Sequence, residues 1–364
     1  MKHSNFYSLL ILILLHSFYA AGQSGHWEVL KIKNETPARS ECGLAAVNGK
    51  LYLIGGDGSK AVESFDPITL QWTRLSDAPI DMHHFQAVSY NNRIYVLEAF
   101  AGGGFPDQVP MSNVYIYDPK NDTWQKGGEV PADRRRAGAG AVAYKDKLYL
   151  IAGIQHGHSS GTTNRFDVYD AKTGVWTQLP DAPHIRDHCS ATVVNDKLYV
   201  VGGRNTSYHE PDNFMAFFSK TVLDVDCYDF KTGKWSVLPA KLPLGSGGGA
   251  VVNFNDVLYY IGGERATTTE QNASRKNTYY LDPSTQHQWI ETDSLNNGRN
   301  GMAAVVLNNK IYVTGGSGGG PSGPPPGGKN NFSDSTNHNR MPPPFNANNI
   351  SGKVKPSIEI FSLK

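Results

Sequence analysis

Charged and histidine side chains recur at two kinds of place in this chain. One kind precedes a run of small residues, as in "RDHCSATVV" (186–194), and the other follows a pair of glycines, as in "VVGGR" (200–204). Guanidinium groups bind carboxylates and sulfates through paired hydrogen bonds, and carboxylates and imidazoles transfer protons. The candidate ligand-binding residues at these places are Arg39, His83, His84, Arg135, Arg136, Arg186, His188, Arg204, Glu264, Arg265 and Arg299.

The places recur because the chain repeats a strand, a tight turn and a second strand. Six segments have this pattern: residues 41–56, 83–99, 137–153, 186–204, 245–263 and 301–316. Their turns, such as Asn48-Gly49 and Asn195-Asp196, contain residues that tolerate the left-handed backbone that a hairpin requires.

A second motif follows each of the first five hairpins. "VYIYDPKNDTW" and its relatives predict an alternating strand, a turn opened by Asp, and a short strand that begins at Trp. Each unit therefore has four antiparallel strands. The six tryptophans (Trp27, Trp72, Trp124, Trp176, Trp235 and Trp289) all take the same place in a unit, 45 to 59 residues apart.

A period near about 50 residues, with a hairpin that ends in Gly-Gly and a later Trp, resembles the Kelch motif over residues 25–364. A lone four-stranded sheet cannot bury both faces, whereas six sheets arranged radially bury each face against a neighbour. We therefore expect an all-β, six-bladed propeller. The sixth unit lacks a Trp of its own, so the strand around Trp27 should complete blade six and close the ring.

In such a propeller, the segments that enter the first strand and leave the second strand emerge on one face. We expect the repeated Tyr and Trp to fill the seams between blades, and the small first strands to surround a central channel. The opposite face has short turns, while the first face has connections of very unequal length. Because a rigid scaffold often displays its functional residues on such loops, we expect the binding site there.

Composition and targeting signals give further expectations. The 364-residue chain has a formal net charge of +1, which favours neither nucleic acid nor a membrane as partner. Residues 1–22 have the layout of a secretory signal peptide, and no later segment predicts a transmembrane helix. Residues 23–364 should then be one secreted (or, in a bacterium, periplasmic) monomeric propeller, with a flexible Gly/Pro/Asn-rich loop at 317–356.

Cysteine and asparagine signals add two expectations. Three cysteines are too few for a disulfide framework, so we expect buried thiols. Six Asn-x-Ser/Thr sites would accept glycans in a eukaryote: Asn34, Asn121, Asn205, Asn272, Asn331 and Asn349.

Three classes of function remain open. Kelch propellers are most often binding modules, and the arginines at one channel mouth predict an anionic carbohydrate or a protein as ligand. An Arg before the first strand is also a common Kelch feature that joins blades, which is the structural alternative for each of them. The second class is an enzyme that resembles sialic-acid mutarotase, for which Glu264 with Arg265, and Glu98, are the candidate carboxylates.

The third class, a copper oxidase similar to galactose oxidase, lacks an identifiable radical site here. His83-His84 and His156-Gly-His158 have no carboxylate or Cys partner at ligand spacing, so we interpret them as surface loop and expect no metal and no cofactor.

Overall fold

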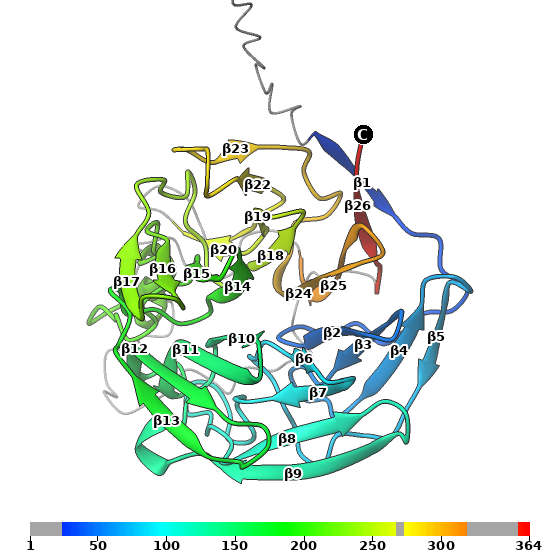
Figure 1. Ribbon diagram of the computed structural model, residues 1–364, viewed down its shortest axis with the longest axis horizontal. Coiled ribbons are helices and arrows are strands. Elements are labelled where there is room, and N and C mark those ends of the chain that lie inside the picture. Colours follow the sequence, from blue (N-terminus) through cyan, green and yellow to red (C-terminus); the bar gives the residue numbers. More distant parts are fainter. Residues whose placement is uncertain (1–23, 267–272, 319–355) are drawn as a thin grey trace, which may run out of the picture.

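The computed structural model describes residues 24–266, 273–318 and 356–364. Six four-stranded antiparallel sheets surround a common centre (Figure 1). From the inner strand outward, blade I is β2(Gly43–Val47), β3(Lys50–Ile54), β4(Val62–Asp66) and β5(Gln71–Arg74). Blade II is β6(Val88–Tyr90), β7(Arg93–Val96), β8(Asn113–Asp118) and β9(Thr123–Glu129). Blade III is β10(Gly140–Tyr144), β11(Lys147–His156), β12(Ser160–Tyr169) and β13(Trp176–Leu179).

Blades IV and V continue in the same order. They are β14(Ser190–Val194), β15(Lys197–Val201), β16(Asp226–Asp229) and β17(Lys234–Val237), and then β18(Ala250–Phe254), β19(Val257–Ile261), β22(Thr278–Leu281) and β23(Ile290–Glu291). A separate pair, β20(Glu264–Arg265) and β21(Ala273–Ser274), lies in the connection of blade V. The helical segments of the described chain are two 3-10 turns, Ala132–Arg134 and Phe214–Ser219.

Blade VI confirms the predicted closure of the ring. Its strands are β24(Asn300–Leu307), β25(Lys310–Ser317), β26(Glu359–Leu363) and the N-terminal strand β1(Gly25–Val29), which pairs with β26 in register from Gly25–Leu363 to Val29–Glu359. The first and last strands of the described chain thus lie side by side in one sheet (Figure 1). Trp27 is buried against Phe361, at 5.3 Å between ring centroids, and its indole N–H donates to Thr278 of blade V.

The turns between the first and second strands follow the sequence prediction. Asn91, Asn92, Asn195 and Asp196 all have positive φ, as two-residue hairpins require. A glycine after the second strand then joins neighbouring blades, as where the Gly203 amide donates to the Ser246 carbonyl at 2.8 Å.

Six apolar clusters lie in the six seams, each built from two neighbouring blades. Tyr52 packs with Tyr117, Tyr199 with Tyr260, and Tyr259 with Tyr280 in three of them. Trp27, Trp72 and Trp289 are buried, and the other three tryptophans are half-buried. The predicted role of the repeated Tyr and Trp in the seams is confirmed.

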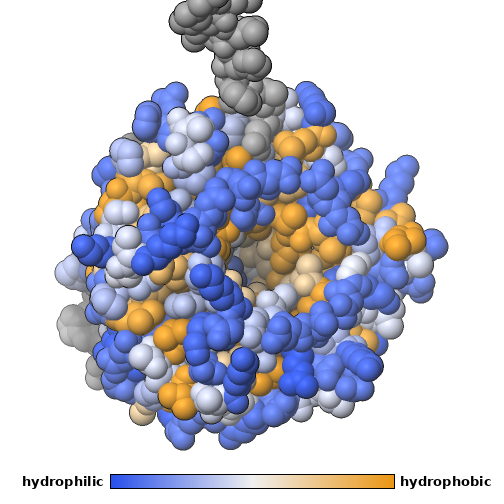
Figure 2. All heavy atoms as spheres, viewed as in Figure 1, coloured by the Kyte–Doolittle hydropathy of each residue, from blue (hydrophilic) through white to orange (hydrophobic). Residues whose placement is uncertain are grey.

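The inner strands leave a central channel of about 440 Å³. Small side chains line it, including Ala45, Ala87, Ala141, Ala191 and Ala303. Figure 2 shows the hollow at the centre of the disc, with apolar residues in its wall and hydrophilic residues around it.

Some predictions concern residues that the structure does not describe. The signal peptide (1–22) and nearly all of the blade-six loop (317–356) lie outside the described residues, as do Asn272, Asn331 and Asn349. Cys42, Cys189 and Cys227 are buried free thiols, as expected. Within the described segments, no helix has the length and hydrophobicity needed to cross a membrane.

Candidate functional site

A ring of backbone hydrogen bonds surrounds one mouth of the channel. Each blade contributes one residue with positive φ, between 50° and 64°, at or just before the start of its inner strand: Glu41, His84, Gly138, His188, Gly248 and Gly301. Five amide-to-carbonyl bonds of 2.6 to 2.9 Å link them, for example from the His84 amide to the Glu41 carbonyl. The left-handed conformation is uncommon outside glycine, so the ring holds Glu41, His84 and His188 in fixed positions at the mouth.

The arginines that precede four of the inner strands lie inside their blades. The side chains of Arg39, Arg136, Arg186 and Arg299 are at most 3% exposed. Each pairs with a carboxylate on the third strand of its own blade: Arg39 with Glu63, Arg136 with Asp167 at 2.8 Å, Arg186 with Asp226 at 2.9 Å, and Arg299 with Glu359 at 3.1 Å. The expectation that these four guanidinium groups face a ligand is therefore wrong, because they are buried in ion pairs.

The two blades that lack this arginine also lack the carboxylate on the third strand. Met82 and Ser246 take its place in blades II and V. The third-strand position that carries the carboxylate elsewhere then carries Tyr115, opposite Val96, or Tyr279, opposite Tyr260. The arginine and the acid occur together or not at all, which identifies the pair as part of the blade.

The remaining charged candidates also have protein partners. Arg135 is half-buried and pairs with Glu129 at 2.8 Å. Arg204 is buried, pairs with Glu264 at 2.7 Å, and lies over the rings of Phe217 and Phe218.

Glu264 also accepts a hydrogen bond of 2.7 Å from Asn300, so both of its oxygens are engaged. Arg265 is half-buried in β20, and its carbonyl accepts from Arg275. Both arginines of the post-glycine positions therefore lie within the connections of blades IV and V.

Three buried imidazoles from neighbouring blades meet at the channel mouth. They are His84 of blade II, His158 at the tip of the β11–β12 hairpin of blade III, and His188 of blade IV. Their ring centroids are 5.0 to 5.2 Å apart. His83 is also buried beside His84, whereas His156 is exposed. The interpretation of His83, His84 and His158 as surface loop is wrong.

Burial sets the protonation state of these imidazoles. It lowers the pKa of His84 and of His158 well below the usual value, and neighbouring histidines and Arg204 lower both further. Burial also lowers the pKa of His188, and the positive charge of Arg204 lowers it further, although the hydrogen bond with Asp187 opposes the shift. At neutral pH the three rings are uncharged, so each keeps one nitrogen lone pair.

Loops from blades II, III and IV join over this cluster. We call residues 98–112, 155–160 and 203–222 the cap. The amide of His158 donates to the Pro106 carbonyl at 2.7 Å, and the imidazole of His209 lies 2.9 Å from the Ser159 carbonyl. Phe105 meets Phe214 with 5.8 Å between ring centroids. Three loops of unequal length thus form one packed surface.

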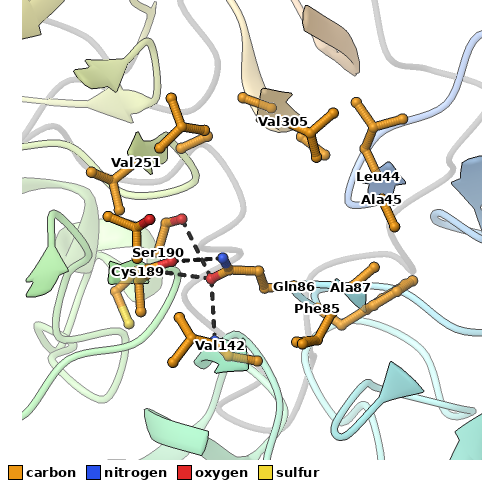
Figure 3. A pocket seen from close by; sticks show the side chains of 18 of the residues that line it. Leu44, Ala45, Phe85, Gln86, Ala87, Val142, Cys189, Ser190, Val251 and Val305 are labelled. Atoms are coloured by element: carbon orange, nitrogen blue, oxygen red, sulfur yellow. Dashed lines mark hydrogen bonds between the residues drawn. The ribbon is translucent and has the colours of Figure 1, made fainter. Parts of the chain in front are cut away.

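Two polar side chains reinforce the channel below the mouth. Gln86 crosses from blade II to donate to the Ala191 carbonyl at 2.8 Å and to accept from the amides of Ala141 and Ala191 (Figure 3). Glu98, at a position where the other units have Gly or Ala, is 2% exposed and accepts from the Gln86 backbone amide at 3.3 Å. Burial holds the pKa of Glu98 well above its usual value.

Comparisons with known proteins agree with this architecture. Residues 85–316 match the model of the KLHDC2/KLHL20/DRC7 Kelch-repeats domain, and residues 38–79 and 298–335 match the Kelch motif. The molecule is a Kelch-type β-propeller, and the chain belongs to the Kelch-repeat family.

The chain is similar to several curated proteins over part of their length. It is 26% identical to Kelch-like protein terF of Aspergillus terreus over 76% of this chain and 60% of that protein. It is 26% identical to Kelch-like protein 40 of Xenopus tropicalis over 58% of this chain and 33% of that protein. It is also 26% identical to alpha-scruin of Limulus polyphemus over 66% of this chain and 25% of that protein. The chain thus spans a quarter to three fifths of the length of these relatives.

A solved structure, titled "Structure of YjhT", superimposes with a TM-score of 0.66 at 17% sequence identity. The superposition covers 80% of this chain and 94% of the other. At this identity the likeness shows the fold.

Proposed function

We propose that this protein is a secreted binding module that holds a protein ligand on the cap. The observation that carries the proposal is the cap itself: loops of three neighbouring blades, unequal in length, packed into one surface on a rigid scaffold. Interaction with protein partners is the general role of Kelch propellers, which supports a protein as the ligand class.

The exposed chemistry of the cap favours an apolar or basic segment over the anionic carbohydrate that the sequence predicted. The aliphatic side chain of Val109 is 58% exposed, and Phe105, Tyr208 and Phe214 are half-buried. Asp107 and Asp212 are exposed and Glu210 is half-buried, whereas the ammonium of Lys220 lies over the Tyr208 ring at 4.2 Å. These carboxylates would repel an anionic ligand, and the arginines that were expected to bind such a ligand are engaged in ion pairs.

A matched pair of variants tests the site. Val109 on the cap and Ile68, 87% exposed in a turn on the opposite face, are both accessible aliphatic side chains. A random peptide library is selected on the purified propeller, and the recovered peptides are titrated against Val109→Asp and Ile68→Asp. Val109→Asp should weaken binding at least about tenfold, as loss of an apolar contact at a binding centre does. Ile68→Asp should leave the affinity within about twofold.

Three results would contradict the proposal. The first is equal loss of peptide binding in both variants. The second is selective binding of acidic glycans on an array with no peptide recovered. The third is acceleration of sugar anomerisation, followed by NMR and abolished by Glu264→Gln, which would establish the mutarotase alternative.

Secretion is tested separately. Eukaryotic cells that express the whole chain should release a protein whose N-terminus lies near Gln23, because the leader is expected to be cleaved after about Gly22. Retention of an uncleaved chain inside the cells would contradict this part.

A further inference from the structure

The three buried imidazoles of the channel mouth have the arrangement of metal ligands. His84, His158 and His188 are 7%, 6% and 5% exposed, and one ring nitrogen of each lies within 4.8 Å of those of the other two. The hydrogen bonds of the described residues do not join any two of these three rings. The rings therefore face one another without direct bonding.

The second nitrogen of each ring already has a partner. Nδ1 of His188 lies 2.6 Å from the Asp187 carboxylate, and Nδ1 of His158 lies 3.1 Å from Oε1 of Gln108. Nδ1 of His84 lies 2.6 Å from Nδ1 of His83. A histidine that binds a metal usually donates its other N–H to a carboxylate or an amide oxygen, which fixes the ring and leaves the opposite nitrogen for the metal.

The nitrogen of His188 that this arrangement leaves over has no hydrogen-bond partner among the described residues. This nitrogen is Nε2, and it is buried, since His188 is only 5% exposed. An unsatisfied buried polar atom is costly, and a metal ion would satisfy it.

The support behind Asp187 also resembles the outer partners of a metal centre. Asp187 is fully buried and accepts hydrogen bonds from the amide of Thr206 at 3.0 Å and from the hydroxyls of Thr162 and Thr206. Its carboxylate is thereby held against His188 and brings one negative charge close to the cluster.

The surrounding charges can accommodate a cation. The guanidinium of Arg204, whose charge lowers the pKa of all three imidazoles, is paired with Glu264 at 2.7 Å. A further acidic side chain, Glu41, lies 3.7 Å from Nε2 of His84 and is 18% exposed, and burial raises its pKa to about 8. Three imidazoles suit zinc, copper, nickel or cobalt and not magnesium or calcium, which require oxygen ligands.

We propose that His84, His158 and His188 form a three-histidine site for a divalent transition metal ion, with zinc as the ion that this donor set fits best. Tetrahedral coordination needs the nitrogens about 3.3 Å apart, so binding would draw the rings together. Because His158 lies at a hairpin tip of the cap, the ion would tie blades II, III and IV at the mouth. The site is independent of the proposed protein ligand, since the metal is measured without it.

The test uses the whole mature chain, free of affinity tag and stripped with a chelator. Titration with Zn²⁺ by calorimetry should give one site per chain, and Co²⁺ should give the intense visible absorption of a tetrahedral ion. His158→Ala and His188→Ala should each weaken Zn²⁺ binding by more than about 100-fold, and Asp187→Asn by about 10- to 100-fold. His156→Ala, exposed and two residues from His158, should leave the affinity unchanged.

The variants also separate loss of the site from loss of the fold. His158 lies on a hairpin tip outside the six seam clusters, so His158→Ala should still unfold in one cooperative transition without metal, as the metal-free wild type does. Absence of stoichiometric binding to the wild type, or equal loss in His156→Ala and His158→Ala, would overturn the proposal. Octahedral Co²⁺ spectra would overturn it as well.

Discussion

Removal of the carboxylate from one buried ion pair tests whether the arginines of the channel mouth are structural. Arg186 and Asp226 are both 0% exposed and lie 2.9 Å apart. The Arg186 guanidinium also donates to the carbonyls of Gly202 and Asp224 at 3.0 Å. In Asp226→Ala the guanidinium would keep only these carbonyls in a dry site. Breaking a buried pair in this way costs about 3–5 kcal/mol of unfolding free energy.

The expected loss corresponds to a fall in melting temperature of about 4–8 °C for a chain of this size. It is measured by thermal unfolding and by urea titration of the purified propeller. Lys231→Ala removes an exposed pair, since Lys231 is 72% and Asp196 40% exposed at 2.9 Å, and should leave the melting temperature within about 1 °C. The double variant Arg186→Leu, Asp226→Leu should regain most of the lost stability, because an apolar pair of similar size replaces a desolvated ionic one.

The reasoning is refuted if Asp226→Ala unfolds within about 1 kcal/mol of the wild type. It is also refuted if the double variant Arg186→Leu, Asp226→Leu folds normally but no longer binds the selected peptide, while Val109→Asp binds that peptide as tightly as the wild type does. The first result would show that the pair contributes little to stability, and the second would make Arg186 a ligand-binding residue.

Three further predictions concern closure, pH and glycosylation. Trp27→Ala should destabilise the propeller by about 3–5 kcal/mol in urea titrations, since a buried indole is lost from the strand that closes the ring; unchanged stability would place the closure elsewhere. Glu98→Gln should match the wild type near pH 4 and melt at a higher temperature at pH 8, because a raised pKa in the folded state makes stability fall as pH rises above the unfolded value; equal melting at both pH values would contradict this. Asn34 should carry no glycan in a secreted eukaryotic product by mass spectrometry, because its side chain makes paired hydrogen bonds of 2.8 and 2.9 Å with the Trp72 backbone; a glycosylated Asn34 in folded protein would contradict that pairing.

Sequence reasoning predicted the scaffold because each local signal repeats six times. The Asn-rich turns, the Tyr of the second strand and the regular place of Trp all agree on one unit. Trp27 precedes the first hairpin, and the sixth unit is the one that lacks a Trp strand, so the strand around Trp27 is expected to complete that unit. Closure of blade six by the N-terminal strand is therefore predictable from the chain alone.

The sequence also contains a signal for the structural role of the arginines, which appears only when the six units are compared with one another. Comparison of the six units places Arg186 with Asp226, and Met82 with Tyr115, at equivalent positions. An arginine that occurs only in units with an acid on the third strand indicates an ion pair inside the blade. Charge at a strand end alone does not distinguish this pair from a ligand site.

The histidine cluster could be predicted only in part. His84 and His188 occupy the same position in units II and IV, which indicates one rim of the channel. His158 reaches them because β11 and β12 extend to ten residues each and place their tip over the mouth. Gln86 and Gln108 gave no signal, since their roles depend on contacts between blades that no spacing within one unit reveals.

Hydrogen exchange of the peptide-bound protein tests the central claim most directly. With a selected peptide bound, the account predicts slower amide exchange in the cap, residues 98–112, 155–160 and 203–222. Exchange should stay unchanged in the turns of the opposite face at 48–49, 195–196 and 255–256. Slower exchange confined to those turns, with an unaffected cap, would contradict the claim that this protein binds its ligand on the loop-rich face.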